Sequence, residues 1–324
     1  MAVSFYSQAA ANRRDSFILV LVVVAILAAL GFAIGFGLTG ETVGGMGLLG
    51  IFGLIAIISS LASYYAGDKM VLGVSKARAV TAAEQPQLLN VVNELTIAAG
   101  IPMPAVYLID DSAPNAFATG RDPAHASIAI TSGLLEKLDR EALQGVIGHE
   151  LSHVRNYDIR YALLLGVLVG TVALMADFFL RFTFFGGLGR GRRSSSGGGG
   201  LQAVILIIAL VLAVLAPIFV ALLQLAVSRQ REYLADASSV ELTRNPAGLE
   251  RALAVIANDT EKLEVANRAT QHLYFTNPIK KFEKRSAGLF STHPPILERI
   301  NRLRTLTGEG PLDAALADEL KGRD

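Results

Sequence analysis

The stretch REALQGVIGHELSHVRN, residues 140–156, decides the architecture of the soluble part of this chain. Asp139 precedes it and is a good N-cap residue, so we expect a helix that begins there and runs through the whole stretch. Residues four positions apart lie on one face of a helix, so His149 and His153 can bind one metal ion, each at about 2.0–2.1 Å. Glu150 lies beside them, where a carboxylate can take a proton from an attacking water.

The pentapeptide H-E-x-x-H also allows a second interpretation, in which both histidines cap or pack the helix without binding a metal. A catalytic zinc site needs three protein ligands and one open position, so a third ligand has to come from elsewhere in the chain. The metzincin form of the motif requires Gly at position 156 and His at position 159. This chain has Asn156 and Ile159 there, which excludes that subclass.

The composition predicts that part of the chain lies in a membrane. Hydrophobic residues make up 52% of the 324 residues and charged residues only 18%, whereas a soluble domain has roughly a quarter charged residues. Four apolar runs approach or exceed the roughly 20 helical residues that cross a bilayer. They are Phe17–Leu38, Gly45–Ala66, Tyr161–Leu180 and Leu201–Val227.

The first two apolar runs predict a hairpin with both ends in the cytoplasm. Arg13 and Arg14 precede it and Lys69 follows it, while the connection 39–44 has no Lys or Arg, as the positive-inside rule requires. The first run is longer than the roughly 7–15 apolar residues of a signal peptide, so we interpret it as a retained anchor. The topology of the second pair stays open, because the Gly/Ser/Arg-rich loop 181–200 between its runs contains four arginines.

Composition also excludes several classes of site. The chain has no cysteine, which excludes a disulfide scaffold, a thiolate metal site and a cysteine nucleophile. Its net charge of +1 argues against a nucleic-acid partner, which requires a concentrated basic face.

The segment between the second and third apolar runs predicts a small mixed domain. Leu88–Ala99 has helical spacing and stops at Gly100, which is a typical helix end. Ala105–Ile109 and Ser127–Thr131 predict two short strands, and Ala113–Pro123 between them is predicted to be a loop.

Glu232 is the candidate for the third metal ligand. It lies in the charged stretch 228–236, and Asp236, one turn later on the same helix face, can accept a hydrogen bond from the far nitrogen of a ligand histidine. Taken alone, this stretch favours a charged turn that leaves the membrane. However, the H-E-x-x-H helix ends just before the third apolar run, and Glu232 follows the fourth. A hairpin returns its two ends to the same side, which predicts a metal site at the membrane face.

His293 is followed by two prolines that fix the backbone. It can donate to the oxyanion that forms when water attacks a peptide carbonyl. The alternative is an ordinary surface histidine.

Several motifs in register resemble the HtpX heat-shock protease family, a group of gluzincins related to the CAAX prenyl proteases. The resemblance extends from about Ser75 to Leu303. It is carried by Asn115-Ala116-Phe117-Ala118-Thr119-Gly120, by G-x-I-x-H-E-L-x-H ending at His153, by Asp158, by Ser228-Arg229, Arg231-Glu232-Tyr233 and Asp236, and by Ser291-Thr292-His293-Pro294.

The resemblance implies a stress-response endopeptidase of the bacterial inner membrane that degrades misfolded or damaged membrane proteins from the cytoplasmic side. It implies one Zn²⁺ per chain. The residue roles that it implies are zinc ligation by His149, His153 and Glu232, catalysis by Glu150 and His293, support of the ligands by Asp236 and Asp158, and a grip on the substrate backbone by Asn115.

We therefore predict a mostly α chain in which two membrane hairpins are joined to a zincin-type metalloprotease domain with a small β-sheet. The predicted parts are a first hairpin (1–66), a first catalytic segment (67–160), a second hairpin (161–227) and a second catalytic segment (228–324). The expected partners are polypeptide substrates and the lipid bilayer, with the oligomeric state open. A non-enzymatic zinc-binding membrane scaffold and a CAAX-type prenyl-peptide protease are the alternatives.

Overall fold

The computed structural model describes residues 5–181, 229–259 and 294–312, together with positions 207, 211, 261, 263 and 274–275. The chain divides into two compact units. Unit 1 comprises Met1–Arg13, Ala66–Leu163 and Leu225–Asp324, and unit 2 comprises Arg14–Tyr65 and Leu164–Gln224.

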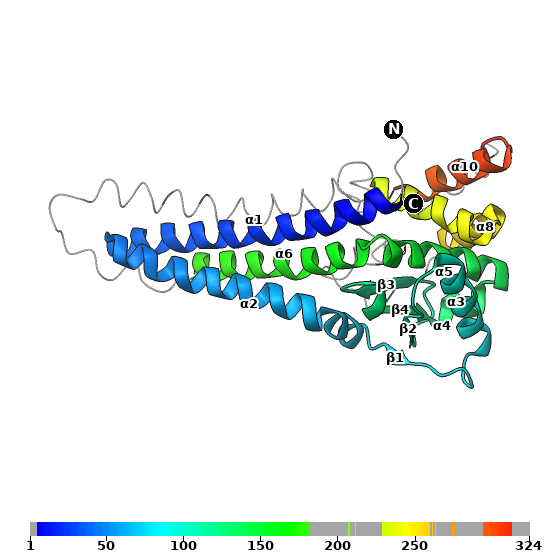
Figure 1. Cartoon of the computed structure of the whole chain (residues 1–324), viewed down its shortest axis with the longest axis horizontal. Coiled ribbons are helices and arrows are strands. Elements are labelled where there is room, and N and C mark those ends of the chain that lie inside the picture. The colour runs from blue at the N-terminus through cyan, green and yellow to red at the C-terminus, as the bar shows by residue number, and fades with distance from the viewer. Residues whose placement is uncertain are drawn as a thin grey trace. The chain divides into compact units, whose positions relative to one another are not determined.

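Unit 2 contains the greater part of three long apolar helices, which Figure 1 draws as α1 (Phe5–Thr39), α2 (Thr42–Val74) and α6 (Asp158–Arg181). Within the described residues, three helical stretches are long and apolar enough to cross a membrane, namely Ala9–Thr39, Thr42–Val74 and Asp158–Asp177. The first three predicted runs are therefore confirmed as helices. The fourth run, Leu201–Val227, and most of the loop 181–200 lie outside the described residues.

The helices of unit 2 pack closely through small residues. A Cβ atom on Gly31 of α1 would lie 2.5 Å from the carbonyl oxygen of Leu48 on α2. Leu30, Phe52 and Ala176, one from each helix, are buried in a shared apolar cluster. Many large apolar side chains of α1 and α2 point outward, and Ile51, Leu54 and Leu61 are more than half exposed. Outward apolar faces of this extent are typical of helices in contact with lipid, and they support membrane association.

Unit 1 contains a four-stranded sheet of order β1-β2-β4-β3. Its strands are β1 (Arg78–Ala79), β2 (Ala105–Ile109), β3 (Ala116–Gly120) and β4 (Ala126–Thr131). The two predicted strands are β2 and β4, which pair in parallel with Val106 opposite Ile128. β3 pairs antiparallel with β4, with Ala118 opposite Ile128, and is an edge strand.

The prediction of a loop over Ala113–Pro123 is wrong for residues 116–120, which form β3. The segment AFATG consists largely of residues with little preference for strands, so its own sequence gives no strand signal. β3 forms because all five residues pair with β4 and because Ala116 and Ala118 are buried in the core beneath the sheet. Tertiary pairing overrides local preference here.

The helices of unit 1 have clear end signals. They are α3 (Pro86–Ala99), α4 (Ser132–Lys137), α5 (Arg140–Arg155), α8 (Pro246–Asn258) and α10 (Ile296–Thr307), with a further helical segment over 229–243 and a short 3₁₀ helix η1 (Pro123–His125). The predicted N-cap of α5 is confirmed, because the Asp139 carboxylate accepts a 2.7 Å hydrogen bond from the Ala142 N–H. The predicted end of α3 is also confirmed, with Gly100 in the left-handed region at φ 67°.

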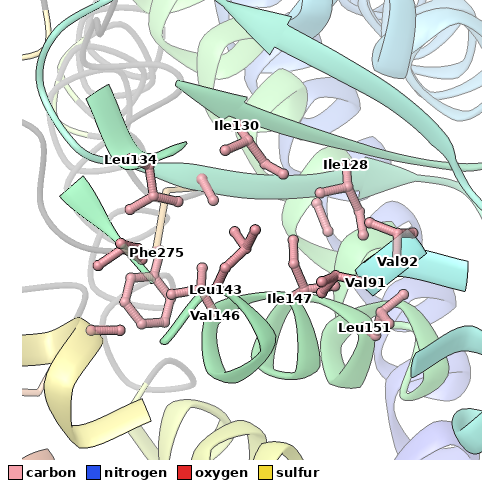
Figure 2. Packing of buried hydrophobic residues seen from close by; sticks show 14 of the residues in the cluster. Val91, Val92, Ile128, Ile130, Leu134, Leu143, Val146, Ile147, Leu151 and Phe275 are labelled. Atoms are coloured by element: carbon pink, nitrogen blue, oxygen red, sulfur yellow. The ribbon is translucent and has the colours of Figure 1, made fainter. Parts of the chain in front are cut away.

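The core of unit 1 fixes α5 against one face of the sheet. Figure 2 shows side chains of α5 facing those of β4, with side chains of α3 beside them. The labelled residues of these three elements are Leu143, Val146, Ile147 and Leu151 of α5, Ile128 and Ile130 of β4, and Val91 and Val92 of α3. All of them are buried, so the helix that carries H-E-x-x-H is held rigidly over most of its length.

Candidate active site

α5 brings both histidines of the H-E-x-x-H motif to one place. The Nε2 atoms of His149 and His153 lie 3.1 Å apart. Glu232 approaches from the helical segment 229–243, with Oε2 3.5 Å from His149 Nε2 and Oε1 3.6 Å from His153 Nε2. One potential ligand atom from each of the three residues thus lies within 4.8 Å of the others.

Gly148 of α5 allows the helical segment 229–243 to come this close. A Cβ atom on Gly148 would lie 2.9 Å from the Ser239 hydroxyl, and that hydroxyl donates a 2.6 Å hydrogen bond to the Gly145 carbonyl oxygen. Ser239 lies seven residues after Glu232, on the same side of the helix. The contact at Ser239 therefore fixes the position of the segment along α5, and with it the position of Glu232 relative to the two histidines.

The other ring nitrogen of each histidine contacts a carboxylate. His149 Nδ1 lies 2.9 Å from Asp236 Oδ1, and His153 Nδ1 lies 3.0 Å from Asp158 Oδ2. An ionised carboxylate only accepts hydrogen bonds, so in the neutral rings Nδ1 donates and Nε2 keeps its lone pair. Both histidines are thus oriented as metal ligands are, with Nε2 as the ligating atom.

The donor set fits a divalent metal ion. Two imidazole lone pairs and one carboxylate converge in a buried place, an arrangement that is unfavourable without a cation between them. Donors bound at about 2.0–2.1 Å in a tetrahedral site lie about 3.3–3.4 Å from one another. The closest approaches between the three side chains, from 3.1 to 3.6 Å, lie near that spacing, with Glu232 approaching each histidine through a different carboxylate oxygen.

Glu150 lies next to this cluster and is buried. Burial raises the pKa of its carboxyl, and the negative charge of Glu232 acts in the same direction. Positive charge on His149 and His153 and a hydrogen bond from the Ala118 N–H oppose the rise. The hydrogen bond from Ala118 links Glu150 to β3, the edge strand of the sheet.

His153 has a strongly shifted pKa in the metal-free protein. Burial alone would lower it, but the hydrogen bond to Asp158 and the negative charges of Glu232, Asp158 and Glu150 raise it to about 9. A proton and a metal ion therefore compete for Nε2 of this ring.

Arg299 of α10 is a site residue that sequence reasoning did not identify. Its side chain is fully buried, and it donates to both oxygens of Asp236, from Nε at 2.9 Å and from Nη2 at 2.7 Å. Nη1 lies 3.7 Å from Glu232 Oε2. A signal for it exists in the sequence, since Ile296, Arg299 and Ile300 follow the spacing of a helix face that packs against a core.

The two further predicted site residues are Asn115 and His293. Asn115 is buried one residue before β3, where its Oδ1 accepts a hydrogen bond from the Ala116 N–H at 3.0 Å and its backbone N–H bonds to the Thr131 hydroxyl at 2.9 Å. His293 lies outside the described residues.

Comparison with known proteins identifies the family of this chain. Residues 82–307 match the family model "Peptidase family M48". A protein named "Protease HtpX homolog" from Listeria monocytogenes serotype 4a (strain HCC23) is 42% identical over 306 residues, which cover 93% of this chain and 99% of the relative. The protein of the same name from Streptococcus uberis is 43% identical over 299 residues, covering 92% of this chain and 99% of the relative.

Among solved structures, Ste24p of S. mikatae is similar with a TM-score of 0.48 and 19% sequence identity, and the match covers 77% of this chain and 57% of that protein. The family is decided by the M48 match and by the full-length relatives. The chain belongs to peptidase family M48, as a membrane metalloprotease of the HtpX group.

Proposed function

We propose that this chain is a zinc-dependent endopeptidase of the bacterial inner membrane that cuts misfolded or damaged membrane proteins at a site facing the cytoplasm. The observation that carries the proposal is the convergence of His149 Nε2, His153 Nε2 and the Glu232 carboxylate within 4.8 Å. The contacts of both Nδ1 atoms with Asp236 and Asp158 add to it. Two histidines and one glutamate form a known donor set for catalytic zinc.

The residues divide the catalytic work among themselves. When bound, zinc acidifies a water molecule and polarises the peptide carbonyl. Glu150 accepts a proton from the attacking water and passes it to the leaving amine. Its raised pKa suits this role, because a base whose pKa lies nearer to neutral both accepts and releases the proton readily. His293 is assigned the role of donor to the oxyanion, from the sequence alone.

The substrate is assigned to the outer edge of β3, as an added strand. The Ala118 N–H reaches Glu150 from this strand, so a peptide laid along β3 passes the catalytic carboxylate. The Phe275 N–H donates to the Ala116 carbonyl oxygen at 2.8 Å, so the substrate is assigned to the part of the edge that follows Ala116. Asn115, at the start of the strand, is assigned to hold the substrate backbone.

The cytoplasmic orientation rests on the charges that flank the first hairpin. Arg13 and Arg14 precede the first apolar run, and Lys69, Lys76 and Arg78 follow the second. Positive residues stay on the cytoplasmic side of a bacterial inner membrane. The family match and the protease relatives do not favour a non-enzymatic scaffold or a CAAX-type prenyl-peptide protease.

The test uses the full chain purified in detergent, with zinc content and casein cleavage as the two measurements. Glu150→Gln is expected to keep one zinc per chain and to lose cleavage by at least about 100-fold, the lower end of the range for a general base. Glu232→Ala is expected to lose the zinc itself. Glu136→Gln, at an exposed position of α4, is the matched control and should behave as the wild type. A Glu150→Gln variant that cleaves normally would remove the mechanism.

A further inference from the structure

Asn12, near the start of α1, is a buried polar residue that the mechanism above does not use. Its side chain is fully buried. Nδ2 donates to the carbonyl oxygen of Asn156 at 2.8 Å and to Asp158 Oδ1 at 2.6 Å. All three residues belong to unit 1. A buried amide without partners costs free energy. The two hydrogen bonds satisfy this amide and at the same time fix the positions of the groups that accept them.

The two carboxylate oxygens of Asp158 contact different residues. Oδ2 contacts His153 Nδ1 at 3.0 Å, while Oδ1 accepts the hydrogen bond from Asn12. Arg231 Nε lies 3.6 Å from the same Oδ1. The bond from Asn12 fixes the rotation of the carboxylate that orients His153, and as a neutral donor it does so without cancelling the negative charge.

Asn12 also closes the turn between α5 and α6. The Asn156 carbonyl at the end of α5 is one of the groups that a helix end leaves unbonded, and Asn12 supplies its donor. Tyr157, the next residue, has φ 61°, a left-handed conformation that is uncommon for a residue other than glycine. Arg13 and Arg160 lie over the Tyr157 ring at 4.7 and 4.9 Å from its centroid. The turn is thus held by residues of α1 as well as by its own neighbours.

We propose that Asn12 is a positioning residue for the metal site, which holds Asp158 against His153 and so ties the start of the first membrane helix to the catalytic centre. The inference rests on the proposed function, in which His153 is a zinc ligand. α1 continues without a break to Thr39 and contains a candidate membrane span. α6, which contains another, begins at Asp158 itself. Two membrane helices thereby reach the same ligand histidine through one carboxylate.

The first test replaces Asn12 in the full chain, in detergent. Asn12→Leu is close in size but removes the donor, and Asn12→Asp sets a second carboxylate against Asp158. Zinc dissociation into a chelator is expected to be about 10–100-fold faster in both, the usual effect of losing an outer partner of a ligand, with the larger effect for Asn12→Asp. The visible absorption spectrum of the cobalt-substituted protein should shift, and kcat should fall with little change in KM. Asn90→Leu and Asn90→Asp, at an exposed position of α3, are the matched controls.

The second test separates positioning from packing by a double-mutant cycle. If Asn12 acts through Asp158, Asn12→Leu adds less than about threefold to zinc dissociation in an Asp158→Asn background, well inside the 10–100-fold expected of Asn12→Leu alone. An equal effect in both backgrounds, or wild-type zinc dissociation and an unchanged cobalt spectrum in Asn12→Leu, would overturn the inference. If Asn12→Leu lowers the thermal midpoint, Asn12→Ser replaces it in the same zinc-dissociation and cobalt-spectrum measurements. The serine side chain is polar but too short to reach Asp158. A failure of the proposed function would be recognised separately. In that case the purified wild-type chain would contain no zinc, whatever the Asn12 variants do.

Discussion

Arg299 holds Asp236 with two hydrogen bonds, at 2.9 and 2.7 Å, and Asp236 in turn contacts His149 Nδ1 at 2.9 Å. The guanidinium also stacks over the Phe275 ring, 4.7 Å from its centroid, and the same ring packs edge-on against His149, at 4.8 Å between centroids. Arg299 therefore supports the first ligand through a carboxylate and through an aromatic ring. Its charge also compensates two buried carboxylates, those of Asp236 and Glu232.

Replacing Arg299 should destabilise unit 1. Arg299→Ala leaves Asp236 buried without its cation, and breaking a buried ion pair from one side costs about 3–5 kcal/mol. Arg299→Lys keeps the charge but cannot donate to both oxygens in the same fork geometry, so we expect an intermediate loss. Thermal unfolding of the detergent-solubilised chain measures both. Arg302→Ala, whose ion pair with Glu298 is exposed, should cost about 1 kcal/mol or less, and an equal loss in both alanine variants would refute the assignment.

The two carboxylates behind the ligands should differ in their effect on zinc affinity. Asp158→Asn is expected to weaken zinc binding by about 10–100-fold, as is usual for these outer contacts. Asp236→Asn should be more severe, because its NH2 group would replace the oxygen that accepts from Arg299 Nε, two donors cannot bond to each other, and the buried Arg299 would lose the negative charge beside it. Competition with a chromophoric chelator gives both affinities. Equal affinities in the two variants would show that Arg299 plays no part in ligand support.

The sequence predicts those parts of the site that depend on local signals. Asp139 and Gly100 mark the ends of α5 and α3 because capping is a local interaction. β3 could not be predicted in the same way, since the strand depends on pairing with β4. Glu232 was expected near the histidines from the order of the apolar runs, and its carboxylate lies 3.5 and 3.6 Å from them.

Arg299 and Asn12 were missed for a common physical reason. Each occupies a position on the buried face of a helix where the pattern calls for an apolar residue. Asn12 shares that face with Leu19 and Val23 of α1, and Arg299 shares its face with Ile300 of α10. A polar residue on an apolar stripe signals a partner elsewhere, but the identity of that partner is set by the tertiary fold.

Gly145 and Gly148 should tolerate alanine unequally. A Cβ atom on Gly145 would lie 2.7 Å from the backbone of Leu249 on α8, which cannot move without shifting the helix. Gly145→Ala should therefore cost about 1–3 kcal/mol, as overpacking of a core usually does. A Cβ atom on Gly148 would meet the Ser239 hydroxyl at 2.9 Å, so Gly148→Ala should displace the helical segment that carries Glu232 and reduce zinc retention.

Thermal unfolding and zinc content separate these two effects. Gly73→Ala is the control, because nothing lies within 4 Å of its Cβ position, and alanine in an exposed helix position is neutral or stabilising. Full zinc retention by Gly148→Ala would show that the contact at Ser239 does not set the position of Glu232.

Zinc binding should release a proton from His153 at neutral pH. In the metal-free protein, burial would lower the pKa of His153, but the bond to Asp158 and nearby negative charges raise it to about 9. Zinc requires the neutral ring. Below that pKa, the apparent dissociation constant for zinc should therefore rise by about tenfold for each unit by which the pH falls, for each proton released. Calorimetry in two buffers of different protonation enthalpy counts the protons.

The same shift determines how the metal-free protein responds to pH. Because the pKa is raised in the folded state, the protonated ring contributes stability that is fully present below about pH 6.5, its value when unfolded, and that is lost as the pH rises through about 9. The thermal midpoint of the metal-free chain should therefore fall between pH 7 and 9.5 through this group. Asp158→Asn removes the main partner that raises the pKa, so that variant should release fewer protons at pH 8 and show a flatter stability profile. Identical proton counts in the two proteins would mean that Asp158 does not control the protonation of His153.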